Sequence, residues 1–148
     1  MTCLAWCGKT LAADSRSSCD GDIVCDNTQK IYTLNDIPYV IDTLKVIAVA
    51  GRLADFDKIM HYLHSEDFPS ANINHGVHAI IVGERFVYML ENNSGYLIRY
   101  PKKTQLATGS GGVFAKSGMM LGLSAKDAVK HAIKISTSCG GRIQSWSE

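Results

Sequence analysis

The sequence predicts a layered α+β domain, in which helices pack on sheets that are apolar on both faces. Strand patterns occupy much of the chain, and the segment Leu44–Ala50 is nearly all apolar, which is typical of a strand covered on both sides. Helical patterns occur once in the middle of the chain and twice near its end. No internal repeat or linker interrupts this order, so we expect residues 1–148 to form a single domain.

The N-terminal segment predicts a hairpin. Strands are expected at Thr2–Trp6 and Thr10–Ser15, and Gly8 supplies the tight turn between them. Thr2 would then open an edge of a sheet. The polar residues Ser17–Asp26 predict a loop that follows the hairpin.

The next segments carry strand and then helix signals. Lys30–Leu34 shows strand alternation and ends at a turn expected at residues 35–38, so Lys30 begins a strand. The apolar strand Leu44–Ala50 ends at Gly51. Beyond it, apolar side chains recur at helical spacing and predict an amphipathic helix that ends before Pro69: Leu53, Phe56, Ile59, Met60 and Leu63.

The second half of the chain predicts a β meander followed by two helices. The meander consists of three short strands: His78–Gly83, Phe86–Glu91 and Tyr96–Tyr100. An extended segment, Thr104–Thr108, leads into a glycine-rich turn and a helix at Val113–Leu121. A capping box at Ser124–Asp127 begins the second helix, and Arg142–Trp146 forms the last strand.

Composition and charge argue against several classes of function. Of the 148 residues, 46% are hydrophobic and 20% are charged, and the net charge is +1, as is ordinary for a globular chain. Because Lys and Arg are scattered, nothing predicts nucleic-acid binding. Neither a membrane-spanning apolar run nor a secretory signal is found, so we expect a cytoplasmic protein that does not bind membranes. Five cysteines without framework spacing suit reduced thiols: Cys3, Cys7, Cys19, Cys25 and Cys139.

Thr2 follows Met1 directly, and this position can make a threonine reactive. If Met1 is removed, Thr2 carries a hydroxyl nucleophile and a free α-amine, which titrates near about 7.7–8.0 and can act as a base. Threonine at position two is nevertheless common and usually has no catalytic role. Cys3 would become an N-terminal nucleophile only if two residues were removed, which we do not expect.

Metal and cofactor chemistry find little support in the sequence. His61 and His64 share one face of the predicted helix, and His75 and His78 lie near a strand start, but no third ligand accompanies either pair in a known motif. Gly109–Gly112 lacks the lysine of a phosphate-binding loop and the spacing of a dinucleotide fingerprint. We therefore expect no metal and no cofactor.

Six short motifs occur in an order that spans almost the whole chain. They are Thr2, Ala12–Arg16, Lys30–Tyr32, Ala50–Asp55, Gly109–Gly112 and Gly140–Gly141. In this order they resemble the proteasome β-subunits and HslV peptidases of the N-terminal nucleophile (Ntn) hydrolases, and within that group short HslV-like proteins encoded by bacteriophages. The resemblance implies a four-layer αββα sandwich with two central antiparallel sheets.

The resemblance also implies catalytic roles for three residues. Thr2 would attack a scissile carbonyl through Oγ, while its own α-amine takes the proton directly or through one water. Lys30, as an ammonium beside Thr2, would lower the pKa values of the Thr2 hydroxyl and amine, and Asp14 would keep that lysine charged and oriented. Without the resemblance, an ordinary structural ion pair between Asp14 and Lys30 would be the simpler reading.

Further site residues follow from the same resemblance. Gly51 would donate its amide to the oxyanion, kink the backbone between strand and helix, or do both. Ser110 would hydrogen-bond the Thr2 amine, or would only cap a turn. Three residues fall where the family builds its specificity pocket, although each would also suit an ordinary core: Tyr32, Val49 and Leu53.

The function implied is that of a threonine endopeptidase acting on peptides or unfolded proteins. Its relatives associate, so a homo-oligomer is expected, either a ring or a smaller assembly, with an unfoldase or a host protein as a further partner. The helix from Gly112 to Leu121 would present Phe114, Met119 and Met120 to a partner face, or these residues would fill the core.

Two departures favour a second hypothesis, a catalytically silent binding or regulatory protein, including a viral one. Ser136 and Cys139 stand where the family usually has an acid and a Ser or Thr that help to position the nucleophile. While Met1 remains, the nitrogen of Thr2 belongs to an amide and cannot act as the base. An amidase acting on small molecules is a third hypothesis, because the predicted pocket residues are apolar and unspecific.

Overall fold

Antiparallel sheets and helices follow one another in the predicted order. The structure, a computed structural model, describes residues 2–51, 56–65, 77–90 and 97–148. Its strands are β1 (Leu4–Trp6), β2 (Thr10–Ala13), β3 (Ser17–Cys19), β4 (Asp22–Cys25), β5 (Ile31–Tyr39), β6 (Asp42–Ala50), β7 (His78–Gly83), β8 (Phe86–Leu90), β9 (Leu97–Pro101), β10 (Leu106–Thr108) and β11 (Gln144–Ser147). Its helices are α1 (Phe56–Ser65), α2 (Gly112–Met120) and α3 (Ala125–Ile135). The predicted α+β class is confirmed.

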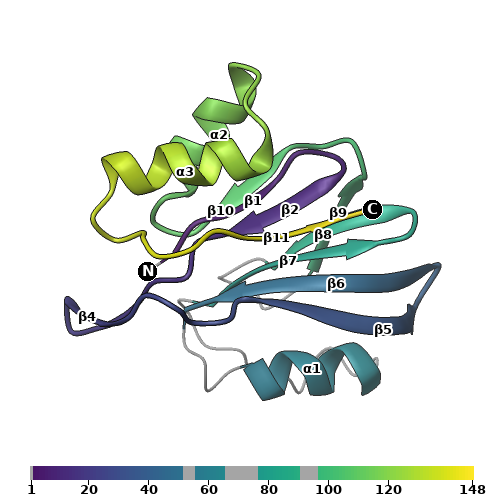
Figure 1. Ribbon diagram of the computed structural model, residues 1–148. Coiled ribbons are helices and arrows are strands. Elements are labelled where there is room, and N and C mark those ends of the chain that lie inside the picture. Colours follow the sequence, from purple (N-terminus) through teal and green to yellow (C-terminus); the bar gives the residue numbers. More distant parts are fainter. Residues whose placement is uncertain (1, 52–55, 66–76, 91–96) are drawn as a thin grey trace.

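Two larger sheets carry helices on their outer sides. One has the strand order β10-β1-β2-β11 and the other β5-β6-β7-β8-β9, with antiparallel pairing between described neighbours in both. Figure 1 shows α2 and α3 over the first sheet and α1 over the far side of the second. Each sheet can therefore bury apolar side chains on both of its faces.

β6 illustrates how the sequence meets this arrangement. Val46, Ala48 and Ala50 pack in the cluster between the sheets, whereas Ile47 and Val49 belong to the cluster that includes α1. All five are at most 2% exposed. The prediction of a strand covered on both faces is confirmed, because both neighbouring layers are apolar.

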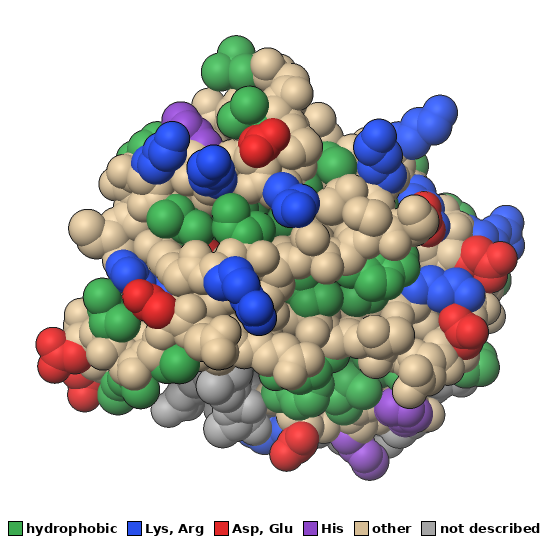
Figure 2. Space-filling view, in the orientation of Figure 1, with side chains coloured by type: hydrophobic (Ala, Val, Ile, Leu, Met, Phe, Trp, Pro, Cys, Tyr) green, Lys and Arg blue, Asp and Glu red, His purple; other side chains and the backbone are tan. Residues whose placement is uncertain are grey.

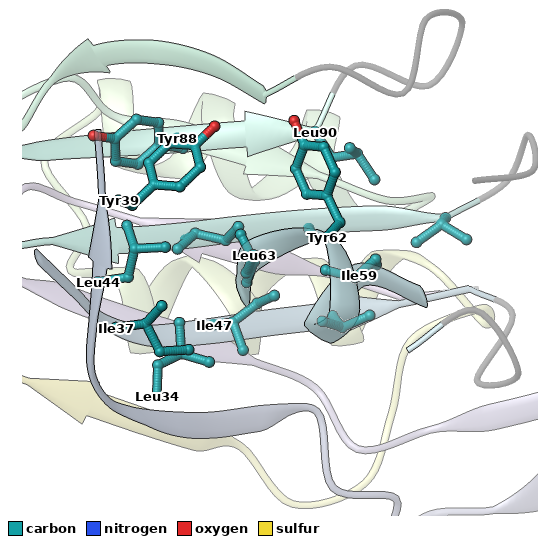
Figure 3. Packing of buried hydrophobic residues seen from close by; sticks show 14 residues of the cluster. Leu34, Ile37, Tyr39, Leu44, Ile47, Ile59, Tyr62, Leu63, Tyr88 and Leu90 are labelled. Carbon is teal, nitrogen blue, oxygen red and sulfur yellow. The ribbon is translucent and has the colours of Figure 1, made fainter. Parts of the chain in front are cut away.

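The helices cover the two sheets with side chains of different size. In Figure 3, Ile59 and Leu63 of α1 lie over Ile47 and its neighbours on the second sheet. On the first sheet, α2 and α3 contribute small residues such as Ala115 and Ala128 to the buried cluster. Small side chains allow a helix to pack close to a sheet. At the start of α2, a Cβ built on Gly112 would lie 3.3 Å from the carbonyl carbon of Ala107 in β10.

The helix ends agree with the sequence where they are described. Ser124 caps α3, because its Oγ accepts the N–H of Asp127 at 3.1 Å, and the predicted helix start at this residue is confirmed. The second bond is not that of a full capping box: Ser124 Oγ donates to Asp127 Oδ2 at 3.0 Å. The predicted helix start at Leu53 lies outside the described residues. Met119 is 1% exposed and fills the core, while Met120 is 73% exposed and stays available to a partner.

The loop predicted for Ser17–Asp26 is wrong, because this segment forms the hairpin β3–β4. Asp20 and Gly21 close its turn with φ values of 52° and 88°. Both faces of β4 are exposed, including Ile23 and Val24. Without a buried face the segment lacks the apolar alternation by which strands are recognised.

Two further expectations need correction. The turn predicted at residues 35–38 is an irregularity within β5, where Asn35 and Asp36 take φ values of 52° and 59° that these residue types tolerate. Thr2 does not open a sheet edge, because β1 begins at Leu4 and lies between β10 and β2. Pairing with β10 joins segments far apart in the sequence, so local patterns cannot reveal it.

The surface carries no single dominant charge on the face seen in Figure 2, where Lys and Arg side chains are spread out with Asp and Glu among them. None of the described helices is long and apolar enough to cross a membrane.

The carboxylate of Asp42 joins the β5–β6 turn to the β7–β8 turn. It accepts four hydrogen bonds, from the N–H groups of Thr43 (2.8 Å), Arg85 (2.9 Å) and Phe86 (3.0 Å) and from the hydroxyl of Tyr88 (3.0 Å). Burial, together with the Asp42 carboxylate, raises the pKa of Tyr88 well above its usual range, so this hydroxyl remains a donor.

We expect Asp42→Asn to lower the free energy of unfolding by about 2 kcal/mol, because an amide group replaces the oxygen that accepts from Phe86 and Tyr88. Urea denaturation measures the change. Asp36→Asn is the matched control: Asp36 is exposed and forms a surface ion pair with Lys45, so its replacement should cost about 0–1 kcal/mol. Equal losses in the two variants would contradict the role of Asp42.

Candidate active site

Thr2 lies against the turn that leads into α2. Its carbonyl oxygen accepts the N–H of Gly111 at 3.0 Å, and its backbone N–H donates to Ser110 Oγ at 3.1 Å. Gly109 passes so close that a Cβ built on it would lie 2.3 Å from the Thr2 carbonyl oxygen. Thr2 is therefore held at its nitrogen and at its carbonyl, and it is only 2% exposed.

The Lys30 ammonium lies against the hydroxyl of Thr2. Lys30 Nζ donates to Thr2 Oγ1 at 2.5 Å, to Asp14 Oδ1 at 2.7 Å and to the carbonyl of Arg16 at 2.7 Å. An ammonium has three donors and no acceptor, so all its hydrogen-bonding capacity is used. Lys30 is 3% exposed, and its orientation is fixed by these three partners.

The carboxylate of Asp14 neutralises the charge of the Lys30 ammonium. Its Oδ1 also accepts the N–H of Cys3 at 3.0 Å, and its Oδ2 accepts the N–H groups of Gly140 at 3.0 Å and Arg16 at 3.4 Å. The carboxylate has no exposed surface, and an unpaired charge at such a position would be strongly unfavourable. The pair is thus a structural ion pair that also orients the ammonium toward Thr2.

Strand ends from both large sheets bring these residues together. Leu4 of β1 pairs with Ala13 of β2 and with Thr108 of β10, so the residues next to them in the chain meet at one end of the first sheet. From the second sheet, the carbonyl of Lys30 accepts the N–H of Val49 at 2.8 Å. The site therefore forms where the ends of the two sheets meet.

This arrangement suits a hydroxyl nucleophile. Because Lys30 can only donate, the proton of the Thr2 hydroxyl is free to go to another acceptor. The nitrogen of Thr2 would become such an acceptor once it is a free amine. A cation beside the oxygen also favours its deprotonated form.

Cys3, the residue after Thr2, does not offer a competing nucleophile. The pKa of Cys3 is raised by its hydrogen bond with Cys139 and by burial, so Cys3 keeps its proton and is unreactive. The same hydrogen bond lowers the pKa of Cys139. Ser136 Oγ accepts the N–H of Ser138 at 3.3 Å and so stabilises its own turn.

The remaining predicted site residues lie around the second sheet. Gly51 directly follows β6, is exposed and takes a φ of 102°, a conformation that favours glycine. Val49 is buried in the α1 cluster. The ring of Tyr32 lies 4.5 Å from that of Phe56 between centroids. Leu53 falls outside the described residues. Around Thr2, the structure brings three of the predicted catalytic residues together: Asp14, Lys30 and Ser110.

The histidines of the sequence do not form a metal site in the described part of the chain. Among the described residues, no cluster of three His, Cys, Asp or Glu side chains could hold a metal ion. His61 and His64 are exposed on α1. His78 Nδ1 shares a hydrogen bond with Thr108 Oγ1 at 2.9 Å, and burial lowers the pKa of its ring. His75 lies outside the described part of the chain.

Two residues that support the site were missed in the sequence. The carbonyl of Arg16 is an acceptor of the Lys30 ammonium, while its guanidinium binds both carboxylate oxygens of Asp26 at 2.7 and 3.0 Å. The side-chain amide of Gln144 binds backbone groups of Thr28 and Lys30. No sequence signal identifies Gln144, because a glutamine at a strand start is usually a surface residue.

Solved structures match the chain over nearly its full length. HslV of Trypanosoma brucei, described as eukaryotic HslV, gives a TM-score of 0.66 at 16% identity, with 99% of each chain covered. BPH of Thiobacillus denitrificans gives a TM-score of 0.66 at 15% identity, with 99% of this chain covered. In its complex with epoxomicin 97% of the BPH chain is covered, and in the structure of BPH by itself 96%.

The sequence of the chain matches no known family model or curated protein. At 15 to 16% identity the structural likeness establishes the fold alone. The chain has the fold of HslV and BPH, as its motifs predicted for HslV.

Proposed function

We propose that the chain is a threonine hydrolase, a peptidase of the Ntn type, in which Thr2 becomes the nucleophile once Met1 is removed. The observation that carries the proposal is the 2.5 Å contact of Lys30 Nζ with Thr2 Oγ1, with Asp14 2.7 Å from the same ammonium. All three side chains are at most 3% exposed. Charges act more strongly in such a setting than in water, and the HslV fold supports the same assignment.

The proposed reaction proceeds through an acyl-enzyme. The free α-amine of Thr2 takes the proton from Oγ1, and Oγ1 attacks the carbonyl carbon of a peptide bond. Lys30 stabilises the deprotonated oxygen, and the amide of Gly51 donates to the developing oxyanion. The Thr2 ammonium then protonates the leaving amine, and water hydrolyses the ester that joins the acyl group to Thr2.

Two features of Thr2 connect this mechanism to processing. Ser110 Oγ already contacts its nitrogen at 3.1 Å and would orient the free amine. Thr2 is 2% exposed, so we propose that its hydroxyl becomes accessible to a substrate only after processing. Removal of Met1 would provide the base and would shorten the chain at the same place.

Peptides or unfolded proteins are the proposed substrates, with Tyr32, Val49 and Leu53 forming the specificity pocket. We further propose that residues 1–148 are one domain with the four-layer αββα order, and that the chain is cytoplasmic. An unfoldase or host partner and a bacteriophage origin stay predictions.

A homo-oligomer, as a ring or a smaller assembly, is the proposed state in solution. Exposed apolar residues at the two ends of α2 support it: Val113, Met120 and Leu121 are 72%, 73% and 85% exposed. Light scattering that detected only a 16.1 kDa particle would contradict this assembly.

Intact-mass analysis tests the proposed function. The mass of cell-made protein is measured before and after incubation with the epoxyketone epoxomicin. The compound is chosen because BPH has been solved in complex with it. We expect a mass lower by one methionine residue and then a single adduct. Thr2→Ala should give no adduct. Thr10→Ala is the matched control, because the Thr10 hydroxyl binds Ser147 at an exposed position, and it should be modified like the wild type.

The second candidate, a silent protein with the same fold, is favoured by the surroundings of Ser136 and Cys139. Ser136 Oγ stabilises its own turn and Cys139 hydrogen-bonds Cys3, so neither contributes an acid to Thr2. Retained Met1 together with no adduct would support this candidate and refute the hydrolase.

A further inference from the structure

Gln144 joins the two large sheets next to the candidate site. It is the first residue of β11, an edge strand of the first sheet, and it pairs with Ala13, the residue before Asp14. Its side chain reaches the start of β5, an edge strand of the second sheet. Oε1 accepts the N–H of Lys30 at 2.9 Å and that of Ile31 at 3.3 Å.

The other end of the same amide is a donor. Nε2 donates to the carbonyl of Thr28 at 2.7 Å, to Ser15 Oγ at 2.9 Å and, more weakly, to the carbonyl of Asp14 at 3.4 Å. One end of the side chain thus faces two N–H groups, and the other faces two carbonyls and a hydroxyl. Only a neutral amide in this orientation satisfies both sets of partners.

These contacts fix the backbone from which the Lys30 side chain extends. The N–H of Lys30 is held by Gln144, and its carbonyl accepts the N–H of Val49 at 2.8 Å. The ammonium at the far end has its own three acceptors. Because Gln144 also binds the residues on either side of the Asp14–Ser15 peptide bond, it sets the two ends of the ion pair relative to each other.

We propose that Gln144 is a positioning residue, whose amide holds the start of β5 where the Lys30 ammonium meets Thr2 Oγ1. The inference rests on the proposed function, since positioning matters only if Thr2 reacts. A misplacement of about 1 Å in a reacting group can cost on the order of 100-fold in rate. The role is distinct from that of Lys30, because Gln144 acts through the backbone of that lysine, whereas the Lys30 ammonium itself contacts Thr2 Oγ1.

The test is the kinetics of epoxomicin adduct formation by Gln144→Met, which keeps the length of the side chain and removes its hydrogen bonds. We expect the maximal rate of labelling to fall about 10-fold or more, while the concentration for half-maximal rate and the final extent of labelling stay unchanged. Simple loss of folded protein would instead reduce the final extent. Hydrogen exchange should show faster exchange of the Lys30 and Ile31 amides.

Two further variants complete the design. Gln144→Glu keeps an oxygen for the Lys30 N–H and should recover part of the rate and the amide protection. Gln29→Ala is the matched control, because the Gln29 side chain is exposed and donates to the carbonyl of Ile31, and it should label like the wild type.

The outcomes separate the two proposals. Labelling of the wild type with an equal maximal rate in Gln144→Met overturns the positioning role and leaves the hydrolase standing. Unaltered exchange of the Lys30 amide in that variant does the same. Absence of any adduct in the wild type refutes the hydrolase, and the positioning role with it, because Lys30 then has no reaction to assist.

Discussion

Replacing Lys30 by methionine should slow the labelling of Thr2 by epoxomicin by about 100- to 1,000-fold or more. The substitution removes the one side-chain cation that contacts Thr2 Oγ1 in the described site, and one preorganised donor to a developing negative charge is typically worth about that factor. It also removes the charge that favours deprotonation of the hydroxyl. Intact-mass kinetics on protein that has lost Met1 provide the measurement.

The design must separate lost chemistry from lost stability. Asp14 has no exposed surface, and breaking a buried ion pair by removing one partner costs about 3–5 kcal/mol, although three N–H groups still bind this carboxylate. The double variant Lys30→Met with Asp14→Asn should regain part of the stability and none of the labelling. Urea denaturation of both variants measures the first effect.

A second lysine offers a matched control for the charge itself. Lys45 pairs with Asp36 at 2.7 Å, the same distance as in the buried pair, but both side chains are substantially exposed. Lys45→Met should therefore label at the wild-type rate. If Lys30→Met also labelled at that rate, the catalytic role assigned to Lys30 would be wrong.

Gly109→Ala should lower the free energy of unfolding by about 3 kcal/mol or more. The added Cβ would lie 2.3 Å from the carbonyl oxygen of Thr2, a backbone atom that no side-chain rotation can move away. Overpacking of this kind costs about 1–3 kcal/mol, and the φ of 89° adds a further cost of about 1 kcal/mol for a residue with a Cβ. Relief of the clash would move Thr2 away from Lys30, so labelling should be lost as well.

Gly122→Ala distinguishes the clash from the backbone strain. Gly122 has a similar φ of 98°, but a Cβ built on it meets nothing within 4 Å. We expect this variant to lose only about 1 kcal/mol of stability and to label normally. Equal stability losses in the two variants, measured by urea denaturation, would show that the contact of Gly109 with Thr2 does not constrain the site.

The sequence revealed those parts of the fold and site that leave a local pattern. The two-sided burial of β6 and the cap at Ser124 followed from apolar runs and from capping chemistry. The contact of Thr2, Asp14, Lys30 and Ser110 required more than periodicity, because only the order of motifs indicated that these residues meet.

The errors arose where tertiary contacts override local signals. The β3–β4 hairpin has no buried face, and the polar kink at Asn35 and Asp36 looked like the end of a strand that continues beyond it. Gln144 could not be found, because its role depends on a backbone 114 residues earlier in the chain. A polar side chain that hydrogen-bonds segments far apart in the sequence leaves no characteristic residue spacing by which it could be recognised.

The ion pair at the centre of the candidate site depends on residues near both ends of the chain. Gly140 donates to Asp14 across 126 positions, and Gln144 binds Lys30 across 114. During synthesis the first strands leave the ribosome long before these residues are made. A nascent or truncated chain that lacks Gly140 and Gln144 would therefore lack the hydrogen bonds that hold Asp14 and Lys30. The candidate site would form only after these last residues have been made and folded.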